Sequence, residues 1–326
     1  MISAPKLSIC IPTYNRVNTL QETLESILPQ VAENPAVEVV ISDNASTDNT
    51  ANLCREFESR FPIVRYYPNS ENLGFDGNVA ACVRKAQGEY ISFFSDDDLS
   101  PPDTFPALLN HLIRRKPAIL YINHTPFLHN NPCHRMEPMA PRLEQEFTDG
   151  KEYFFFAGLG FLSALTVKTE YARQFIEQVN YGRGTSHLDL VARVALTQEG
   201  PFLYVGTLMV FARYEYKSSG DILTHGLMNV TKLHLELQQE KLLSAEDIRR
   251  LIHSIIRHPL PRCVLNNRCR KTGVVRTAEL VGLYGHDPFF YLYVYPLLLI
   301  PPFLFRPIGL MLRSILHWFR RVRYGE

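Results

Sequence analysis

The sequence predicts an α/β fold with a mostly parallel central sheet flanked by helices. Short β-branched and aromatic runs alternate with segments of helical periodicity over residues 6–115. Polar loops follow several of these runs, and open α/β sheets place ligands at the carboxyl ends of their strands. The 326 residues are 46% hydrophobic and 21% charged, which is enough apolar material for a large core.

The first half of the chain contains four predicted strands with helices between them. The strands span residues 6–11, 37–41, 63–67 and 90–94. Two serines have the residue type and position of helix N-caps. Ser46 precedes the helix that carries Leu53 and Phe57, and Ser100 precedes Pro101 at a first helical position.

The second half is less regular, and it divides the chain into three predicted parts. Strands are predicted at residues 161–167, 202–205 and 208–214, and helices at residues 186–196, 221–241 and 245–258. Ser244 is the predicted cap of the last helix. The predicted domains are a catalytic domain over residues 1–218, a helical basic segment over 219–288 and an apolar, amphipathic tail over 289–326.

Charge is unevenly distributed along the chain. Residues 1–247 contain 21 Lys plus Arg against 30 Asp plus Glu, whereas residues 248–326 contain 13 against 3. Residues 289–305 are apolar but interrupted by prolines, and residues 309–322 have the pattern of a basic amphipathic helix with Trp318. The tail therefore predicts contact with an anionic membrane surface rather than with nucleic acid. The alternatives are a helix packed on the body of the protein and a homo-oligomer interface.

The six cysteines form no CxxC pair and no zinc-like cluster with histidine. The first fifteen residues lack the apolar region of a secretory signal peptide. These features predict free thiols and a cytoplasmic protein. Combined with the tail, they predict a peripheral location on the inner face of the plasma membrane.

Three consecutive carboxylates, Asp96, Asp97 and Asp98, follow the predicted strand at residues 90–94. Adjacent like charges repel and favour a compensating cation. A hard divalent ion with oxygen ligands, itself bound to a phosphate, meets that requirement. The alternative interpretation is a solvated acidic turn.

Four motifs in order give the sequence a family resemblance. They occupy residues 7–16, 39–48, 72–78 and 88–98. With them the chain resembles the family 2 inverting glycosyltransferases, which have the GT-A fold. Within the family it looks most like enzymes that add sugars, including dideoxyhexoses such as abequose, during bacterial O-antigen assembly.

The resemblance implies a nucleotide-diphosphate sugar donor, a glycan or lipid-linked oligosaccharide acceptor, and Mg²⁺ or Mn²⁺. It implies a metal site at Asp97 and Asp98. For Asp43, a turn residue that bonds its own backbone is the alternative. The residues implied to bind the donor are Pro12, Thr13, Tyr14, Arg16, Asp43, Asn72, Gly74, Asn78, Ser95 and Asp96.

The sequence departs from the family pattern at two places. Ser95 replaces the first acid of the usual Asp-x-Asp motif, and only Asp189 remains of a later Glu-Asp pair. Asp189 is the predicted general base, and the alternative is an acid that stabilises a helix N-terminus. Glu215 and Asp221 are the reserve candidates. The Gln-x-x-Arg-Trp motif of processive relatives is absent, which indicates transfer of a single sugar.

Two other functions compete with sugar transfer. A sugar nucleotidyltransferase would have a loop rich in Gly, Arg and Lys after the first strand, and residues 12–16 do not have it. A non-catalytic scaffold that keeps the fold within a glycan-assembly complex is conceivable, because the first acid is lost.

Overall fold

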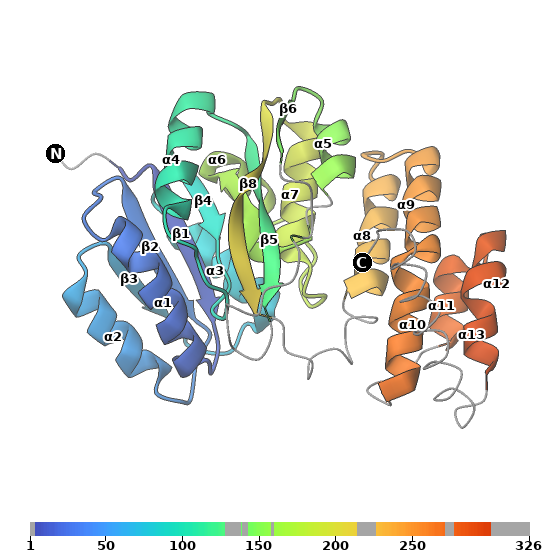
Figure 1. The fold of residues 1–326 in the computed structure, drawn as a ribbon, viewed down its shortest axis with the longest axis horizontal. Helices are drawn as coiled ribbons and strands as arrows, with labels where there is room; N and C mark the ends of the chain where they lie inside the picture. Colours follow the sequence, from blue (N-terminus) through green and yellow to red (C-terminus); the bar gives the residue numbers. More distant parts are fainter. Residues whose placement is uncertain are drawn as a thin grey trace, which may run out of the picture. The chain divides into compact units, whose positions relative to one another are not determined.

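The computed structural model describes residues 4–127, 138, 143–157, 160–213, 226–270 and 277–300, without the side chains of 266–270 (Figure 1). Contacts divide the chain into two compact units, Met1–Glu215 (unit 1) and Tyr216–Glu326 (unit 2). None of the helices within the described ranges has both the length and the apolarity needed to cross a bilayer.

The described part of unit 1 contains an eight-stranded sheet in the order β3-β2-β1-β4-β7-β5-β8-β6. The first four strands along the chain pair in parallel, whereas β7 runs antiparallel to both β4 and β5, and β6 runs antiparallel to β8. The predicted mostly parallel α/β fold is confirmed. The strands are β1 (Leu7–Thr13), β2 (Val37–Asp43), β3 (Val64–Pro68), β4 (Tyr90–Phe93), β5 (Ile119–Phe127), β6 (Glu144–Phe147), β7 (Leu165–Lys168) and β8 (Phe202–Arg213).

Helices flank this sheet (Figure 1), and an apolar stripe is what lets a helix pack there. In α1, for example, Leu20, Leu24 and Ile27 recur at helical spacing and are fully buried. The helical elements of unit 1 are α1 (Val17–Val31), α2 (Thr50–Arg60), α3 (Gly74–Lys85), α4 (Thr104–Arg115), α5 (Gly150–Ala157), the 3₁₀ turn η1 (Leu162–Ala164), α6 (Thr169–Phe175) and α7 (Ser186–Thr197).

The register of the parallel strands brings their carboxyl ends to one edge. Thr13 at the end of β1 lies beside Asp43 at the end of β2, and Cys10 lies beside Phe93 at the end of β4. Every residue of β1, β2 and β4 is buried, as expected for strands covered on both faces. The polar loops that follow these strands therefore meet, as the sequence predicted.

Both predicted N-caps in this unit are wrong. Helix α4 begins at Thr104 after Asp103. Ser100 instead bonds to α1, because its backbone N–H donates to the Ser26 hydroxyl and its side-chain oxygen accepts from Gln30. Helix α2 begins at Thr50, and the Ser46 hydroxyl instead accepts a hydrogen bond from the backbone of Asn15.

Two strand predictions also change. The two strands predicted between residues 202 and 214 are one strand, β8, whose register against β5 shifts between Ile122 and Asn123. The strand predicted from residue 161 begins at Leu165, after the 3₁₀ turn.

The described part of unit 2 consists of helices. Ser244 forms a reciprocal capping box with Asp247 at the start of α9, which confirms the predicted cap. Ile248, Ile252 and Ile256 form the buried face of this helix. The amphipathic helix predicted at residues 309–322 lies outside the described residues. The helices are α8 (Asn229–Gln239), α9 (Ala245–Arg257), α10 (Pro259–Arg270), α11 (Thr277–Tyr284), α12 (Pro288–Tyr293) and α13 (Tyr295–Leu299).

Candidate active site

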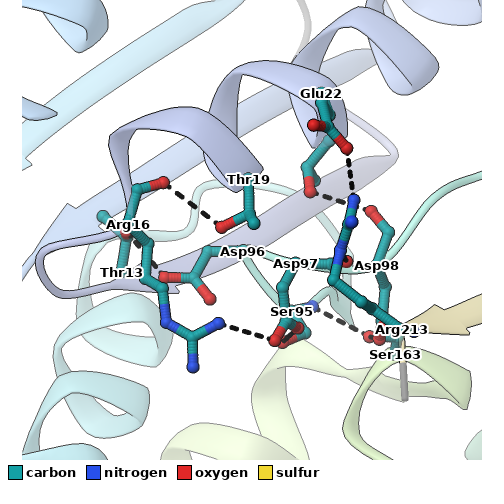
Figure 2. Close-up of polar contacts among 11 residues, drawn as sticks. Thr13, Arg16, Thr19, Glu22, Ser95, Asp96, Asp97, Asp98, Ser163 and Arg213 are labelled. Atoms are coloured by element: carbon teal, nitrogen blue, oxygen red, sulfur yellow. Dashed lines mark hydrogen bonds and ion pairs between the residues drawn. The ribbon is translucent and has the colours of Figure 1, made fainter. Parts of the chain in front are cut away.

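The acid triplet lies in the loop after β4, where each of its carboxylates has different partners (Figure 2). Asp97 is the most open of the three. Its Oδ2 accepts a hydrogen bond from Nη1 of Arg16 at 2.8 Å, and its Oδ1 accepts one from the Ser95 hydroxyl at 2.6 Å. The side chain of Asp97 is 23% exposed and that of Arg16 is 46% exposed, so this ion pair faces solvent. Asp97 is thus the carboxylate that a ligand reaches most directly.

Asp96 faces the end of β1. Its Oδ2 accepts a hydrogen bond from the Thr13 hydroxyl at 2.7 Å. Burial, followed by the nearby charge of Asp97, raises the pKa of Asp96 to about 6, although Thr13 and Arg16 oppose the shift. The structure therefore brings together five residues that the sequence assigned to the site: Thr13, Arg16, Ser95, Asp96 and Asp97.

Asp98 points into the protein. It is 2% exposed, and its two oxygens accept hydrogen bonds from the Ser163 hydroxyl and from the backbone N–H of Arg213. Burial is the main reason that its pKa rises to about 8. The predicted role of Asp98 as a metal ligand remains untested, and these contacts favour a role in holding the loop against β8.

Two residues that hold the acid triplet in position, Arg213 and Ser163, were not identified from the sequence. The Arg213 side chain is 2% exposed, donates from Nε to the backbone carbonyl of Asp97 at 2.8 Å, and forms an ion pair with Glu22 of α1. The Ser163 hydroxyl accepts from the backbone N–H of Ser95 at 2.8 Å. A lone arginine at the end of a predicted strand was the signal available for Arg213.

The acid triplet suits a divalent ion that is also bound to a phosphate group. Within the described residues, no group of three or more His, Cys, Asp or Glu side chains is arranged to hold a metal by itself. Asp97 nevertheless offers a partly exposed carboxylate, and Mg²⁺ in particular is often bound by one or two carboxylates together with substrate phosphates. The residues therefore fit an ion that arrives with a diphosphate rather than one held in a cage made by the protein alone.

Asp43 lies at the adjacent strand end. It is 2% exposed, its Oδ2 accepts from the Tyr66 hydroxyl at 2.8 Å, and its Oδ1 accepts from the backbone of Ser46 at 3.0 Å. The turn contact expected under the alternative interpretation is present. Tyr66, on β3, is a further residue that the sequence did not single out.

Asn72, Gly74 and Asn78 stabilise the chain that follows β3, and their contacts do not bring them together around one pocket. The Asn72 amide oxygen accepts from the side chain of Asn44 at 2.8 Å, and Gly74 has a φ of 71°, which glycine adopts without strain. Asn78 is buried and donates to the carbonyls of Thr13 and Ser42 at 3.2 and 3.0 Å. These three residues support the strand ends of β1 and β2, and their contact with a donor stays a prediction.

A further buried carboxylate, Asp76, organises the loop before α7. Asp76 accepts four backbone N–H hydrogen bonds of 2.7–2.9 Å, although it is far away in the sequence from its partners. These hydrogen bonds lower the pKa of Asp76 despite the opposing effect of burial. The donors are Gly182, Arg183, Gly184 and Ser186.

Asp189 lies in the first turn of α7 with its carboxylate enclosed. It is 1% exposed, its Oδ1 accepts from Nε of Arg193 at 2.7 Å, and its Oδ2 accepts from the backbone of Asn180 at 3.1 Å. Its role as general base is untested, and this enclosure favours a structural role. His187, two residues earlier, packs against Phe75 with ring centroids 5.7 Å apart. The reserve candidates Glu215 and Asp221 lie outside the described residues.

Residues 8–164 match the glycosyl transferase family 2 model, and this segment includes the acid triplet, Arg16 and Ser163. The chain contains a family 2 glycosyltransferase domain. The chain is 44% identical over 108 residues to abequosyltransferase RfbV of Salmonella typhimurium, an alignment that covers 32% of each chain. It is 34% identical over 103 residues to the putative glycosyltransferase EpsE of Bacillus subtilis, covering 31% of this chain and 36% of that one.

Solved glycosyltransferase structures share the fold. S. aureus TarS 1-349 in complex with UDP-GlcNAc superposes with a TM-score of 0.65 at 15% identity, covering 90% of this chain and 82% of that one. Mannosyltransferase PcManGT from Pyrobaculum calidifontis, in complex with GDP-Man and Mn²⁺, gives a TM-score of 0.56 at 14% identity, covering 99% and 88%. At these identities the likeness establishes the GT-A fold of the glycosyltransferase domain and nothing finer.

Proposed function

We propose that the protein is an inverting glycosyltransferase that transfers one sugar from a nucleotide-diphosphate donor. We propose as acceptor a glycan or lipid-linked oligosaccharide in bacterial surface polysaccharide biosynthesis, specifically O-antigen assembly, at the inner face of the plasma membrane. The observation that carries the proposal is the pairing of Asp97 with Arg16 at the carboxyl end of β4. The aligned identity to an abequosyltransferase supports the choice of polysaccharide.

The Asp97–Arg16 pair fits the requirements of a diphosphate leaving group. A developing diphosphate needs positive charge, and a Mg²⁺ or Mn²⁺ ion at Asp97 would act there as a Lewis acid. The half-exposed guanidinium of Arg16 lies 2.8 Å from the same carboxylate, so it is placed to bind phosphate oxygens. The Ser95 hydroxyl keeps the second oxygen of Asp97 oriented, although the first acid of the family motif is absent.

Transfer also requires a group that takes the proton of the acceptor hydroxyl. The sequence assigned this role to Asp189, which could fill it only if its contact with Arg193 opened to admit the acceptor. The loop that Asp76 holds, Gly182 to Ser186, leads directly into α7. The position of Asp189 therefore depends on Asp76, whichever role Asp189 has.

A thermal-shift screen of nucleotide diphosphates, with and without Mn²⁺, tests the proposal. A ligand at a hundredfold excess over its Kd stabilises the native state by about 2.7 kcal/mol, so the Tm should rise for at least one nucleotide and depend on Mn²⁺. If no nucleotide diphosphate raises the Tm, the proposal is wrong. A donor-hydrolysis assay then separates an enzyme from a scaffold, because a scaffold would bind the donor without cleaving it.

A further inference from the structure

We propose that unit 2 carries a binding surface for an anionic phospholipid bilayer. The surface combines the exposed arginine face of α9 with exposed apolar side chains of α12 and α13. It rests on the membrane location proposed above. It does not depend on the sugar transfer that we propose for unit 1, so vesicle binding and nucleotide binding are tested separately.

The basic part of the surface is one side of α9. Arg249, Arg250 and Arg257 are exposed on this helix. They line a hollow of about 420 Å³ together with Glu246, His253, Ser254 and His258. Glu246 is the one acid in that lining, and it pairs with both Arg249 and Arg250. A net positive charge therefore remains on this side of the helix.

The apolar part lies on the two short helices that follow in the chain. Leu292 and Leu299 are 63% and 65% exposed, and Tyr291 and Tyr293 are 48% and 42% exposed. The described residues include eleven exposed large hydrophobic side chains. Four of these eleven lie within the nine positions from 291 to 299. Such a concentration marks an interaction surface rather than the scattered apolar exposure of ordinary proteins.

Contacts within unit 2 join the two parts. The guanidinium of Arg257 lies over the ring of Phe289, 4.7 Å from its centroid, and His253 meets the same ring edge-on at 4.5 Å. The Phe289 ring stacks on that of Tyr293 at 6.0 Å. Helices α9 and α12 are neighbours in this unit (Figure 1), so the arginine side of α9 borders the apolar residues at Arg257.

Charge decides between the possible occupants of this surface. Residues 248–278 contain eight Lys or Arg and no acid, and residues 301–326 contain five Arg and one acid. The chain's own tail and the same face of a second copy would therefore both bring like charge. An anionic bilayer instead offers negative headgroups to the arginines and an interface in which tyrosine and leucine side chains are stable.

Flotation of the full-length protein with vesicles tests the surface. The wild-type protein should float at low salt with phosphatidylglycerol-containing vesicles and much less with phosphatidylcholine alone. Arg249→Ala with Arg250→Ala should weaken binding about fivefold per arginine. Leu292→Ser with Leu299→Ser should weaken it about tenfold. The matched controls in unit 1, Arg55→Ala with Arg60→Ala and Ile113→Ser, should bind like the wild type.

Three outcomes overturn the proposal. One is wild-type protein that ignores anionic vesicles at low salt. Another is that the arginine and leucine variants bind vesicles normally, whereas deletion of residues 301–326 abolishes binding. The tail would then be the membrane-binding element. The third is face variants that change the oligomeric state in light scattering without changing vesicle binding, which would make the surface a self-association site. Nucleotide-induced thermal shifts, measured in the same variants, report separately on the glycosyltransferase domain.

Discussion

Arg213, the last residue of β8, donates a hydrogen bond from Nε to the backbone carbonyl of Asp97, 2.8 Å away. The same side chain pairs with Glu22, and its own backbone N–H is bonded to Asp98. One buried arginine thus joins helix α1, the acid triplet and the end of β8. The carboxylate proposed to bind the donor is therefore oriented by a residue that no donor needs to touch.

The first prediction concerns this positioning residue. Arg213→Gln should lower the affinity for the nucleotide diphosphate about tenfold in the presence of Mn²⁺, because the loop that carries Asp97 loses its support. It should also cost about 1–3 kcal/mol of stability, since buried hydrogen-bond partners are left unpaired. Glu22→Gln is the matched control, because it keeps the bond from Arg213 to the Asp97 carbonyl. Equal nucleotide affinity in both variants would contradict the positioning role.

The second prediction separates two neighbouring carboxylates. Asp97→Asn should abolish Mn²⁺-dependent thermal stabilisation by nucleotide diphosphates, because the most open carboxylate of the triplet is lost. Asp98→Asn should retain it, because Asp98 is 2% exposed and the Asn oxygen still accepts from the backbone of Arg213. Asp103→Asn, at an exposed position, serves as the control. Loss of nucleotide binding in Asp98→Asn would instead support the ligand role that the sequence predicted for Asp98.

Asp97 and Asp98 show which features of the site can be predicted from the sequence and which cannot. The strand-end loops were predictable, because parallel register brings Thr13 and Asp43 to one edge whatever the rest of the chain does. The orientation of Asp98 was not predictable, because it depends on Ser163 and on Arg213, 65 and 115 residues away. The wrong start of α4 has the same origin, since Ser100 bonds to Ser26 and Gln30 of α1, 74 and 70 residues away, instead of capping a helix.

The third prediction is a pH dependence at Asp76. Hydrogen bonds from four backbone N–H groups lower the pKa of this carboxylate in the folded state. A lowered folded pKa means that the stabilisation is present above the unfolded value, about 3.9, and is lost as the pH falls through the folded value. Asp76→Asn should therefore cost about 1–3 kcal/mol at pH 7, and the difference from wild type should shrink in acid.

Urea unfolding of the wild type and the Asp76 variant at neutral pH and well below pH 4, where the folded-state carboxylate becomes protonated, measures this difference. Asp103→Asn again provides the exposed-carboxylate control. A gap that stays constant between the two pH values would show that the charge of Asp76 is not what holds the loop from Gly182 to Ser186.

The last prediction addresses Asp189, for which sequence and structure favour different roles. As a general base it must reach the acceptor hydroxyl, and its loss should lower kcat by about 10²–10⁴-fold. In the structure it is 1% exposed and bonded to Arg193, whose side chain is 7% exposed. Asp189→Asn alone is ambiguous, because it leaves a buried guanidinium without its charge partner and should cost about 3 kcal/mol.

A double variant, Asp189→Leu with Arg193→Met, removes that ambiguity. Replacing both members of a buried ion pair by apolar residues of similar size is often close to neutral in stability. We expect the double variant to recover most of the stability lost in Asp189→Asn and to keep turnover within about tenfold of the wild type, below the loss that removal of a base causes. In that case His187, which is 7% exposed and packed against Phe75, is the next residue to replace. A double variant that folds as well as the wild type yet loses turnover 10²-fold or more would establish Asp189 as the base.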